Sequence, residues 1–247
     1  MMVDIPSELI AQLSVAKNVL VSTGAGISAE SGVPTFRDAQ TGMWSKFRPE
    51  ELATPEAFVR NPKMVWDWYA ERRDQVQAVE PNPGHDALAA LQKFWSDFTL
   101  VTQNVDGLHQ RAGSRDVIEL HGNITRVKCA REGTHVSVWV PNEDEPPKCE
   151  KCGSYLRPDV VWFGESLPVR ALEAATHAAQ CCEVFFSVGT SSVVYPAAGL
   201  TDLALNQGAL VVEVNPDSTP LTDRADFVLP GPSGEVLPVL AKQLGAL

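Results

Sequence analysis

Six short, mostly apolar runs rich in Val, Leu and Phe limit most strongly how this chain can fold. Such runs are typical of strands buried on both faces, as in a parallel sheet. Helical apolar stripes precede several of them, including Leu9 and Leu13 before the first run and Leu88 and Leu91 before the second. The alternation predicts a doubly wound α/β fold around a mostly parallel sheet. The predicted strands are residues 18–23, 98–102, 116–120, 183–188, 209–214 and 226–229.

Two stretches interrupt the alternation. Residues 39–81 carry Pro55 and Pro62 at places that suit the first turn of a helix, so we expect a loop followed by helices. Residues 126–158 combine prolines and cysteines with few apolar residues, which predicts a small module with little core of its own. We expect ligands to bind in the cleft between the parts. The predicted domains are a Rossmann-like domain of residues 1–38, 82–125 and 159–247, and a smaller composite domain of a helical insertion, 39–81, and a zinc-ribbon-like module, 126–158.

Charge and cysteine usage exclude several classes of function. The chain has 20 Lys and Arg against 31 Asp and Glu, and its net charge of -11 argues against a nucleic-acid partner. No apolar run approaches the ~20 residues of a membrane-spanning helix, so we expect no membrane partner. The first residues lack the features of a signal peptide, and five cysteines, an odd number, argue against a disulfide framework. We therefore expect a cytoplasmic protein.

A glycine-rich motif follows the first predicted strand. Gly24, Gly26 and Ala29 match G-x-G-x-x-A, in which the first glycine permits a tight turn and the second lets the backbone approach a pyrophosphate. A helix beginning here would offer its free N–H groups to an anion. The alternative is an ordinary turn, because the acidic residue usually found ~20 positions further on is missing.

Polar residues also follow later predicted strands. Gln103, Asn104 and Asp106 come after the second strand, residues 189–191 after the fourth, and Asn215 after the fifth. Open α/β sheets bind ligands at the carboxyl ends of their strands, where amides and carboxylates can hold a ribose or a carboxamide. The alternative for Asn104 and Asp106 is a turn that caps the following helix.

Taken in order, these blocks resemble the sirtuin family of NAD-dependent protein-lysine deacylases. The matching blocks cover nearly the whole chain: residues 24–28, 31–37, 102–109, 121–123, 161–165, 189–191 and Asn215. The resemblance implies that NAD is consumed as a co-substrate, with Phe36 shielding the reactive carbon from water. The residues that it assigns to NAD are Gly24, Ala25, Gly26, Ser28, Phe36, Arg37, Gln103, Asn104, Asp106, Gly189, Thr190, Ser191 and Asn215.

The resemblance also assigns the catalytic base to His121. An unperturbed imidazole has a pKa of about 6.5, which suits proton transfer near neutral pH. In the family, the acyl-lysine oxygen attacks the anomeric carbon as nicotinamide leaves. The histidine then activates a ribose hydroxyl, and the products are deacylated lysine, nicotinamide and O-acyl-ADP-ribose. Without the family context, a single histidine is more often structural.

Two further blocks concern the acylated substrate. Residues 160–164 form an apolar run that we expect to be a strand. In the family, this edge, here Val161, Trp162, Phe163 and Gly164, pairs with an extended peptide. Tyr69 and Arg72, three residues apart on a predicted helix, and the small Ala53 resemble the branch that removes succinyl and malonyl groups. Arginine and tyrosine together can neutralise a buried carboxylate, and the alternative is an ordinary solvated arginine.

The metal module departs from the family pattern of two C-x2-C pairs. Cys149 and Cys152 form a complete pair, whereas Cys129 is followed by Glu132 where a cysteine is expected. The three thiolates could hold Zn²⁺ with Glu132 or His135 as a fourth ligand, or the module could have lost its metal. Cys181 and Cys182 precede a predicted core strand, and we expect both to be buried.

The sequence therefore predicts an NAD-dependent deacylase of acylated protein or peptide lysines, with desuccinylase or demalonylase as well as deacetylase activity. Two alternatives use the same fold, a plain deacetylase and a mono-ADP-ribosyltransferase. A third is a non-catalytic sensor of NAD or ADP-ribose.

Overall fold

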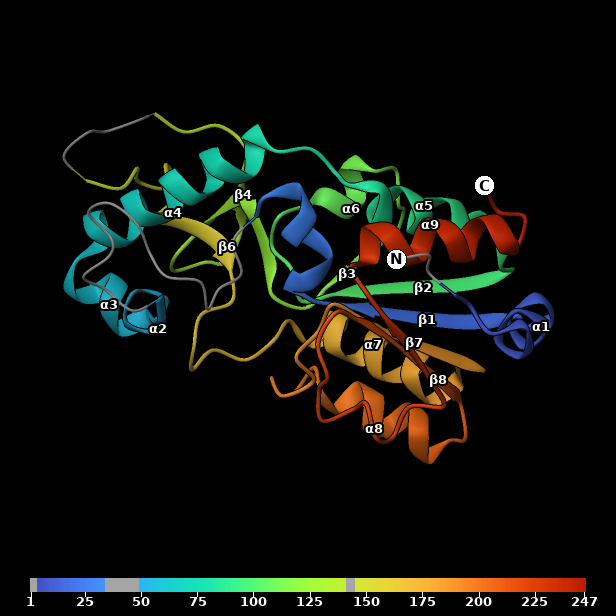
Figure 1. The fold of residues 1–247 in the computed structure, drawn as a ribbon. Coiled ribbons are helices and arrows are strands. Elements are labelled where there is room, and N and C mark those ends of the chain that lie inside the picture. Colours follow the sequence, from blue (N-terminus) through green and yellow to red (C-terminus); the bar gives the residue numbers. More distant parts are fainter. Residues whose placement is uncertain (1–3, 34–48, 141–144) are drawn as a thin grey trace.

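The computed structural model describes residues 4–33, 49–140 and 145–247. Its main feature is a parallel sheet of six strands in the order β3-β2-β1-β7-β8-β9 (Figure 1). Direction along the sheet reverses between β1 and β7, which is the Rossmann arrangement and confirms the predicted fold class. The strands are β1 Asn18–Thr23, β2 Asp97–Thr102, β3 Ile118–Glu119, β7 Val184–Val188, β8 Leu210–Asn215 and β9 Phe227–Pro230.

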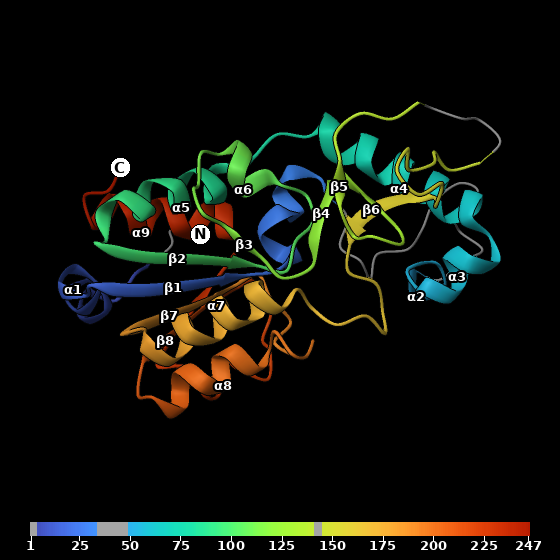
Figure 2. The ribbon, with the colours of Figure 1, turned by 180° about the vertical axis from the view of Figure 1, so that it is seen from behind.

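Helices cover both faces of this sheet, which explains why its strands are mostly apolar. Val19 and Val21 point into one core, and Leu20, between them, points into the other. In Figures 1 and 2, α5 and α9 lie over one face, and α7 and α8 lie over the other. The helices of this part are α1 Ser7–Val15, α5 Pro83–Phe94, α6 Leu108–Arg111, α7 Val169–Cys181, α8 Gly199–Asn206 and α9 Ser233–Gln243.

A smaller antiparallel sheet, in the order β5-β4-β6, lies beyond the end of the large sheet that is opposite α1 (Figure 1). The predicted helical insertion is present, and α3 and α4 begin at Pro55 and Pro62, as the sequence indicates. The Thr54 and Asn61 side chains cap these helices by accepting main-chain N–H bonds. The elements are α2 Pro49–Leu52, α3 Pro55–Arg60, α4 Pro62–Ala78, β4 Gly122–Cys129, β5 His135–Val136 and β6 Leu156–Val160.

Three local predictions were wrong. The third strand contains only Ile118 and Glu119, because just two residues of β2 pair with it. The chain after β1 forms a 3₁₀ helix, η1 Ala25–Ser31, instead of the start of an α-helix. The strand near residue 160 ends at Val160, so residues 161–164 are a loop. The predicted domain boundaries after residues 125 and 158 fall inside β4 and β6, and the division into domains stays a prediction.

None of the helices in the described ranges has both the length and the apolar character needed to cross a membrane.

Candidate active site

Three glycines bring the loops after β1 and β7 into main-chain contact at the point where the strand order reverses. The Gly26 N–H donates to the Gly189 carbonyl at 2.9 Å, and the Gly24 N–H donates to Val188 at 3.0 Å. A Cβ at Gly26 would lie 2.7 Å from Gly189 Cα, and one at Gly189 would lie 2.5 Å from the Ile27 nitrogen. The glycines are therefore needed for the packing of the two loops, whatever ligand binds there.

A buried polar cluster joins the predicted NAD residues of the first two strands. Ser28 Oγ donates to Asp106 Oδ2 at 2.7 Å, and Asn104 Nδ2 donates to Ser28 Oγ and to the Gly24 carbonyl, both at 3.1 Å. Asp106 Oδ1 accepts the Leu108 N–H at 2.9 Å. This carboxylate therefore also forms the turn before α6 that was the alternative interpretation of the sequence. Burial raises the pKa of Asp106. The cluster offers amide, hydroxyl and carboxyl groups for hydrogen bonds to a carboxamide.

His121 lies between β3 and β4, next to this cluster. Its Nδ1 is 2.8 Å from the Gln103 carbonyl, which can only accept, so in the neutral ring Nδ1 carries the hydrogen. Nε2 is then the nitrogen with the lone pair. Burial lowers the pKa of His121, which keeps the ring neutral near pH 7. Gly122 follows at φ +79, where a side chain would collide with the Asp159 carbonyl. The imidazole is thus held in the form that a general base requires.

The residues predicted after β7 and β8 also lie together. Asn215 Nδ2 donates to the Thr190 carbonyl at 2.8 Å, and the buried Thr190 hydroxyl contacts Ser187 Oγ at 3.0 Å. Ser191 is half-buried beside them. Buried Glu213 on β8, which the sequence reasoning missed, accepts the Thr222 hydroxyl at 2.6 Å and also pairs with Thr219. Glu213 thereby fixes the loop that follows Asn215.

Two buried histidines behind the cluster were also missed. His85 Nε2 lies 3.4 Å from Ser28 Oγ, and His109 Nε2 lies 2.9 Å from Thr23 Oγ1, with the two rings 5.0 Å apart. Burial lowers the pKa of His85 to about 4 and that of His109 to about 3, so both are neutral near pH 7. His109 belongs to a matched block, but nothing in the sequence places the ring of His85 beside Ser28.

The residues predicted to read the acyl group lie in the predicted helical insertion, residues 39–81. Ala53, Tyr69 and Trp162 are buried in one apolar cluster, and the Tyr69 and Trp162 rings are 6.3 Å apart. The Arg72 guanidinium lies 5.0 Å from the centre of the Trp68 ring. Burial lowers the pKa of Arg72 and raises that of Tyr69. Arg72 is half-buried, so its role as an acyl reader stays a prediction.

The loop 161–164 is held by an ion pair that the sequence reasoning missed. Arg157 binds both carboxylate oxygens of Glu165, at 2.6 and 2.9 Å, and its guanidinium lies 3.2 Å from the Trp162 ring centre. Glu165 Oε2 also accepts the Trp162 N–H at 2.8 Å, and the Phe163 N–H donates to the Ala53 carbonyl at 2.9 Å. These bonds turn the chain away from β6, which explains why the predicted strand stops at Val160.

A cleft of about 500 Å³ opens beside this loop, between the small sheet and the start of α7. Gly122, Val161 and Glu165 line it together with charged side chains of β4 and β6. The described residues predicted for NAD do not line this cleft. It lies next to the predicted peptide-binding loop, of which Val161 is a lining residue.

Comparison with known proteins decides the family. A model of the Sir2 family matches residues 24–196. This chain belongs to the Sir2 family. It is 57% identical to an NAD-dependent protein deacylase of Aquifex aeolicus over 85% of this chain and 88% of that protein. It is 53% identical to an NAD-dependent protein deacylase of Ralstonia nicotianae, with 95% of each chain covered.

A crystal structure of a Sir2 homologue in complex with NAD is similar over 99% of this chain and 95% of that one. The TM-score is 0.92 and the sequence identity 44%. The family and the fold predicted from the sequence are therefore confirmed. Phe36 and Arg37, which the resemblance also assigns to NAD, lie outside the described residues.

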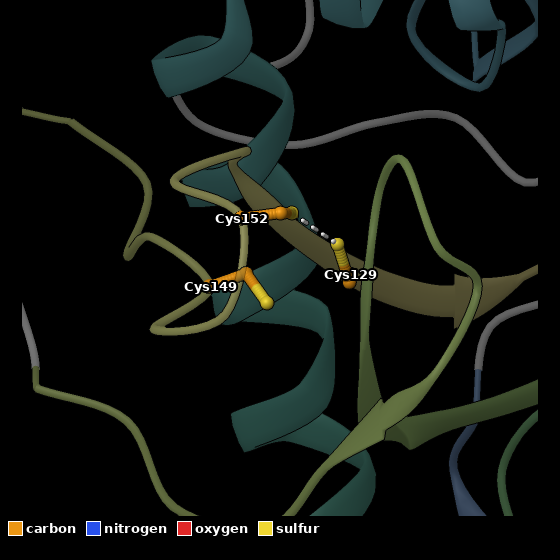
Figure 3. Close-up of side chains that lie close together, drawn as sticks. All are labelled: Cys129, Cys149 and Cys152. Carbon is orange, nitrogen blue, oxygen red and sulfur yellow. Dashed lines mark hydrogen bonds between the residues drawn. The ribbon is translucent and has the colours of Figure 1, made fainter.

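The cysteine module of this Sir2-family chain gathers three sulfur atoms. Cys129, Cys149 and Cys152 have their Sγ atoms within 4.8 Å of one another, with 3.4 Å between those of Cys129 and Cys152 (Figure 3). Sulfurs bound to tetrahedral zinc at ~2.3 Å lie about 3.8 Å apart, so the group fits Zn²⁺. The Glu132 N–H also points at Cys129 Sγ, at 3.4 Å. These three residues would hold the metal.

The two candidate fourth ligands lie outside this group. Among the described residues, only the three cysteines form it, and His135 Nε2 instead pairs with Asp159 Oδ2 at 2.9 Å. Cys182 is buried as predicted, whereas Cys181 is exposed, because it lies on the outer side of the last turn of α7.

Proposed function

We propose that this chain removes acyl groups from protein lysines at the expense of NAD, and that it accepts acyl groups ending in a carboxylate. Membership of the Sir2 family, with relatives at 53% and 57% identity named NAD-dependent protein deacylase, supports the general activity. The position of Tyr69 and Arg72 three residues apart on α4, with Tyr69 buried beside Ala53 and Trp162, is the observation that carries the acyl preference.

In the proposed reaction, the residues at the carboxyl ends of the strands have different tasks. NAD supplies an activated ribose carbon and loses nicotinamide. Ser28, Asn104 and Asp106 bind the carboxamide through the groups of the buried cluster. His121 Nε2 accepts the proton of a ribose hydroxyl, while the Gln103 carbonyl holds the opposite nitrogen. The Gly24–Gly26 turn, Thr190, Ser191 and Asn215 lie where the phosphates and the adenosine bind in this assignment.

The acyl preference follows from desolvation. A carboxylate that reaches Arg72 and the Tyr69 hydroxyl forms charge-assisted hydrogen bonds, which are stronger away from water. An acetyl group has no carboxylate, so it forms no charge-assisted hydrogen bonds with Arg72 and Tyr69. Ala53 leaves room for the longer chain, and the loop 161–164 binds the peptide on either side of the lysine.

The partners are acylated proteins or peptides. Five cysteines, an odd number, argue against a disulfide framework and support a location in the reducing cytoplasm.

Mass spectrometry of reactions with succinyl-, malonyl- and acetyl-lysine peptides tests the proposal. We expect nicotinamide and the matching O-acyl-ADP-ribose from each peptide. Arg72→Met should lower kcat/KM for the succinyl peptide about 10- to 100-fold, the worth of a charged hydrogen bond, and change deacetylation less than about 3-fold.

Arg73→Met is the matched control, because Arg73 lies on the next position of α4 and stacks on Trp66, 5.3 Å away. It should leave the ratio of succinyl to acetyl activity unchanged. An equal fall of both activities in Arg72→Met would refute the acyl preference. Transfer of labelled ADP-ribose to protein would indicate the transferase, and the absence of nicotinamide release would indicate the sensor.

A further inference from the structure

The cysteine module contains the same turn twice. In the first turn, residues 129–133, the Gly133 N–H donates to the Cys129 carbonyl at 2.9 Å. In the second turn, residues 149–153, the Gly153 N–H donates to the Cys149 carbonyl at 2.8 Å. Both glycines have left-handed φ angles, +67 and +70, and neither would meet an atom within 4 Å if it carried a Cβ. The glycines are therefore required by the left-handed backbone conformation of the turn and not by close packing.

The hydrogen bonds that close the two turns also correspond. The Cys129 N–H donates to the Thr134 carbonyl at 2.9 Å, and the Cys149 N–H donates to the Ser154 carbonyl at 2.7 Å. Each cysteine begins its turn, and each glycine lies four residues later. By this correspondence, Glu132 stands where the second turn carries Cys152.

The correspondence also bears on His135. Its equivalent in the second turn is Tyr155, which follows the turn and bonds to Glu145 at 2.9 Å. His135 is likewise directed away from the sulfurs, to Asp159. Of the two candidates that the sequence left open, only Glu132 occupies a ligand position of the repeated turn.

We propose that Glu132 is the fourth ligand, so that the centre binds its metal through three sulfurs and one oxygen. The Glu132 carboxylate is not within the sulfur group in this structure, but its side chain is exposed, so turning it inward disrupts no packing. Its N–H already bonds to Cys129 Sγ, which places its Cα beside the group. Zinc accepts carboxylate oxygen at ~2.0–2.2 Å.

Few buried residues surround the cysteines, so a metal bound through Glu132 would also contribute to the stability of this part of the fold. The cluster that includes Cys129 and Cys149 has five buried members, against 22 in the cluster on one face of the large sheet. Trp66 of α4 is one of the five, and Tyr69 lies one turn further along the same helix. A metal held by Glu132 would thus help to fix α4, the helix that carries the proposed acyl readers.

The test uses the purified full-length chain, stripped of metal and titrated with Co²⁺ and Zn²⁺, with binding followed by visible absorption and chelator competition. The variants are Glu132→Cys and Glu132→Gln. Glu150→Gln is the matched control, because Glu150 is an exposed glutamate at a non-ligand position of the second turn. His135→Gln tests the other candidate.

We expect one metal per chain in the wild type and in Glu150→Gln. Glu132→Gln should bind Co²⁺ more than about 10-fold more weakly, since even the loss of an outer-shell partner costs about 10- to 100-fold. Glu132→Cys should bind more tightly, with stronger sulfur-to-cobalt charge-transfer absorption. Wild-type affinity and spectrum in Glu132→Gln, a weakening confined to His135→Gln, or no metal bound by the wild type would each overturn the proposal. Far-UV circular dichroism confirms that each variant folds.

Discussion

At the carboxyl ends of β1 and β7, Gly24, Gly26 and Gly189 bring the two following loops together through main-chain atoms, and N–H groups donate directly to carbonyls. In the loop after β6, which carries Trp162, the chain is held instead by the side chains of Arg157 and Glu165. The first contact leaves no room for an added atom. The second depends on which side chains are present, because the Glu165 carboxylate accepts the Trp162 N–H.

This difference indicates how the two halves of the site can vary. The half that would bind NAD is built for an unchanging ligand, because its main-chain contact admits no Cβ at Gly26 or Gly189. The half that would bind the acyl group depends on the identity of side chains such as Ala53, Tyr69 and Arg72. Substitutions should therefore abolish function in the first half and change selectivity in the second.

The largest effect is expected at His121. His121→Gln removes the proton acceptor and should lower kcat about 10²- to 10⁴-fold, the usual worth of a general base. NAD affinity, measured by calorimetry, should change less than about 3-fold. His177→Gln, at an exposed histidine on α7, is the control and should behave as the wild type. Undiminished turnover in His121→Gln would show that the proton goes elsewhere.

The glycine contact predicts a loss of stability. Gly189→Ala would bring a Cβ to 2.5 Å from a main-chain nitrogen, so we expect about 2–4 kcal/mol of destabilisation, measured by urea denaturation. Gly208→Ala has the same kind of φ, +79, but meets no atom within 4 Å, and should cost only about 1–2 kcal/mol. If the two variants lost equal amounts of unfolding free energy, the left-handed backbone conformation alone, and not the close contact, would explain the need for glycine at residue 189.

The ion pair between Arg157 and Glu165 predicts a change in substrate binding. Glu165→Gln removes the charge that pairs with buried Arg157 and weakens the bond to the Trp162 N–H. We expect KM for an acylated peptide to rise about 10-fold while kcat changes little. Asp67→Asn breaks the more exposed Lys63–Asp67 pair on α4 and should leave KM unaltered. A fall in kcat alone would argue against a role in holding the peptide loop.

The smallest effects concern pH. Because burial lowers the pKa of His121, the acid limb of the pH profile of kcat/KM should lie below pH 6.5.

The two buried histidines predict a pH dependence of stability. His85 and His109, with pKa values of about 4 and 3 in the folded protein, take up protons more readily when the chain is unfolded. Their contribution to stability is complete above pH ~6.5 and is lost as the pH falls towards 4. Urea midpoints should decline over this range, and less steeply in His85→Gln. A midpoint as acid-sensitive in His85→Gln as in the wild type would exclude His85 as a cause.

The sequence by itself determined where the strands of the large sheet lie, apart from the length of β3, and it determined the starts of α3 and α4 and the glycine turn after β1. These features follow from local properties, namely apolar periodicity, the fixed φ of proline and the missing Cβ of glycine. The motif blocks were sufficient to place the chain in its family, which the comparisons confirm.

Only the tertiary structure decided which side chains meet across long separations. His85 approaches Ser28 across 57 positions, Arg126 pairs with Asp159 across 33, and the two cysteine turns correspond in their hydrogen bonds. The strand expected at residues 160–164 ended early, and the Phe163 N–H instead donates to the carbonyl of Ala53, far away in the sequence. Such contacts depend on the path of the whole chain, and no periodicity or single-residue propensity encodes them.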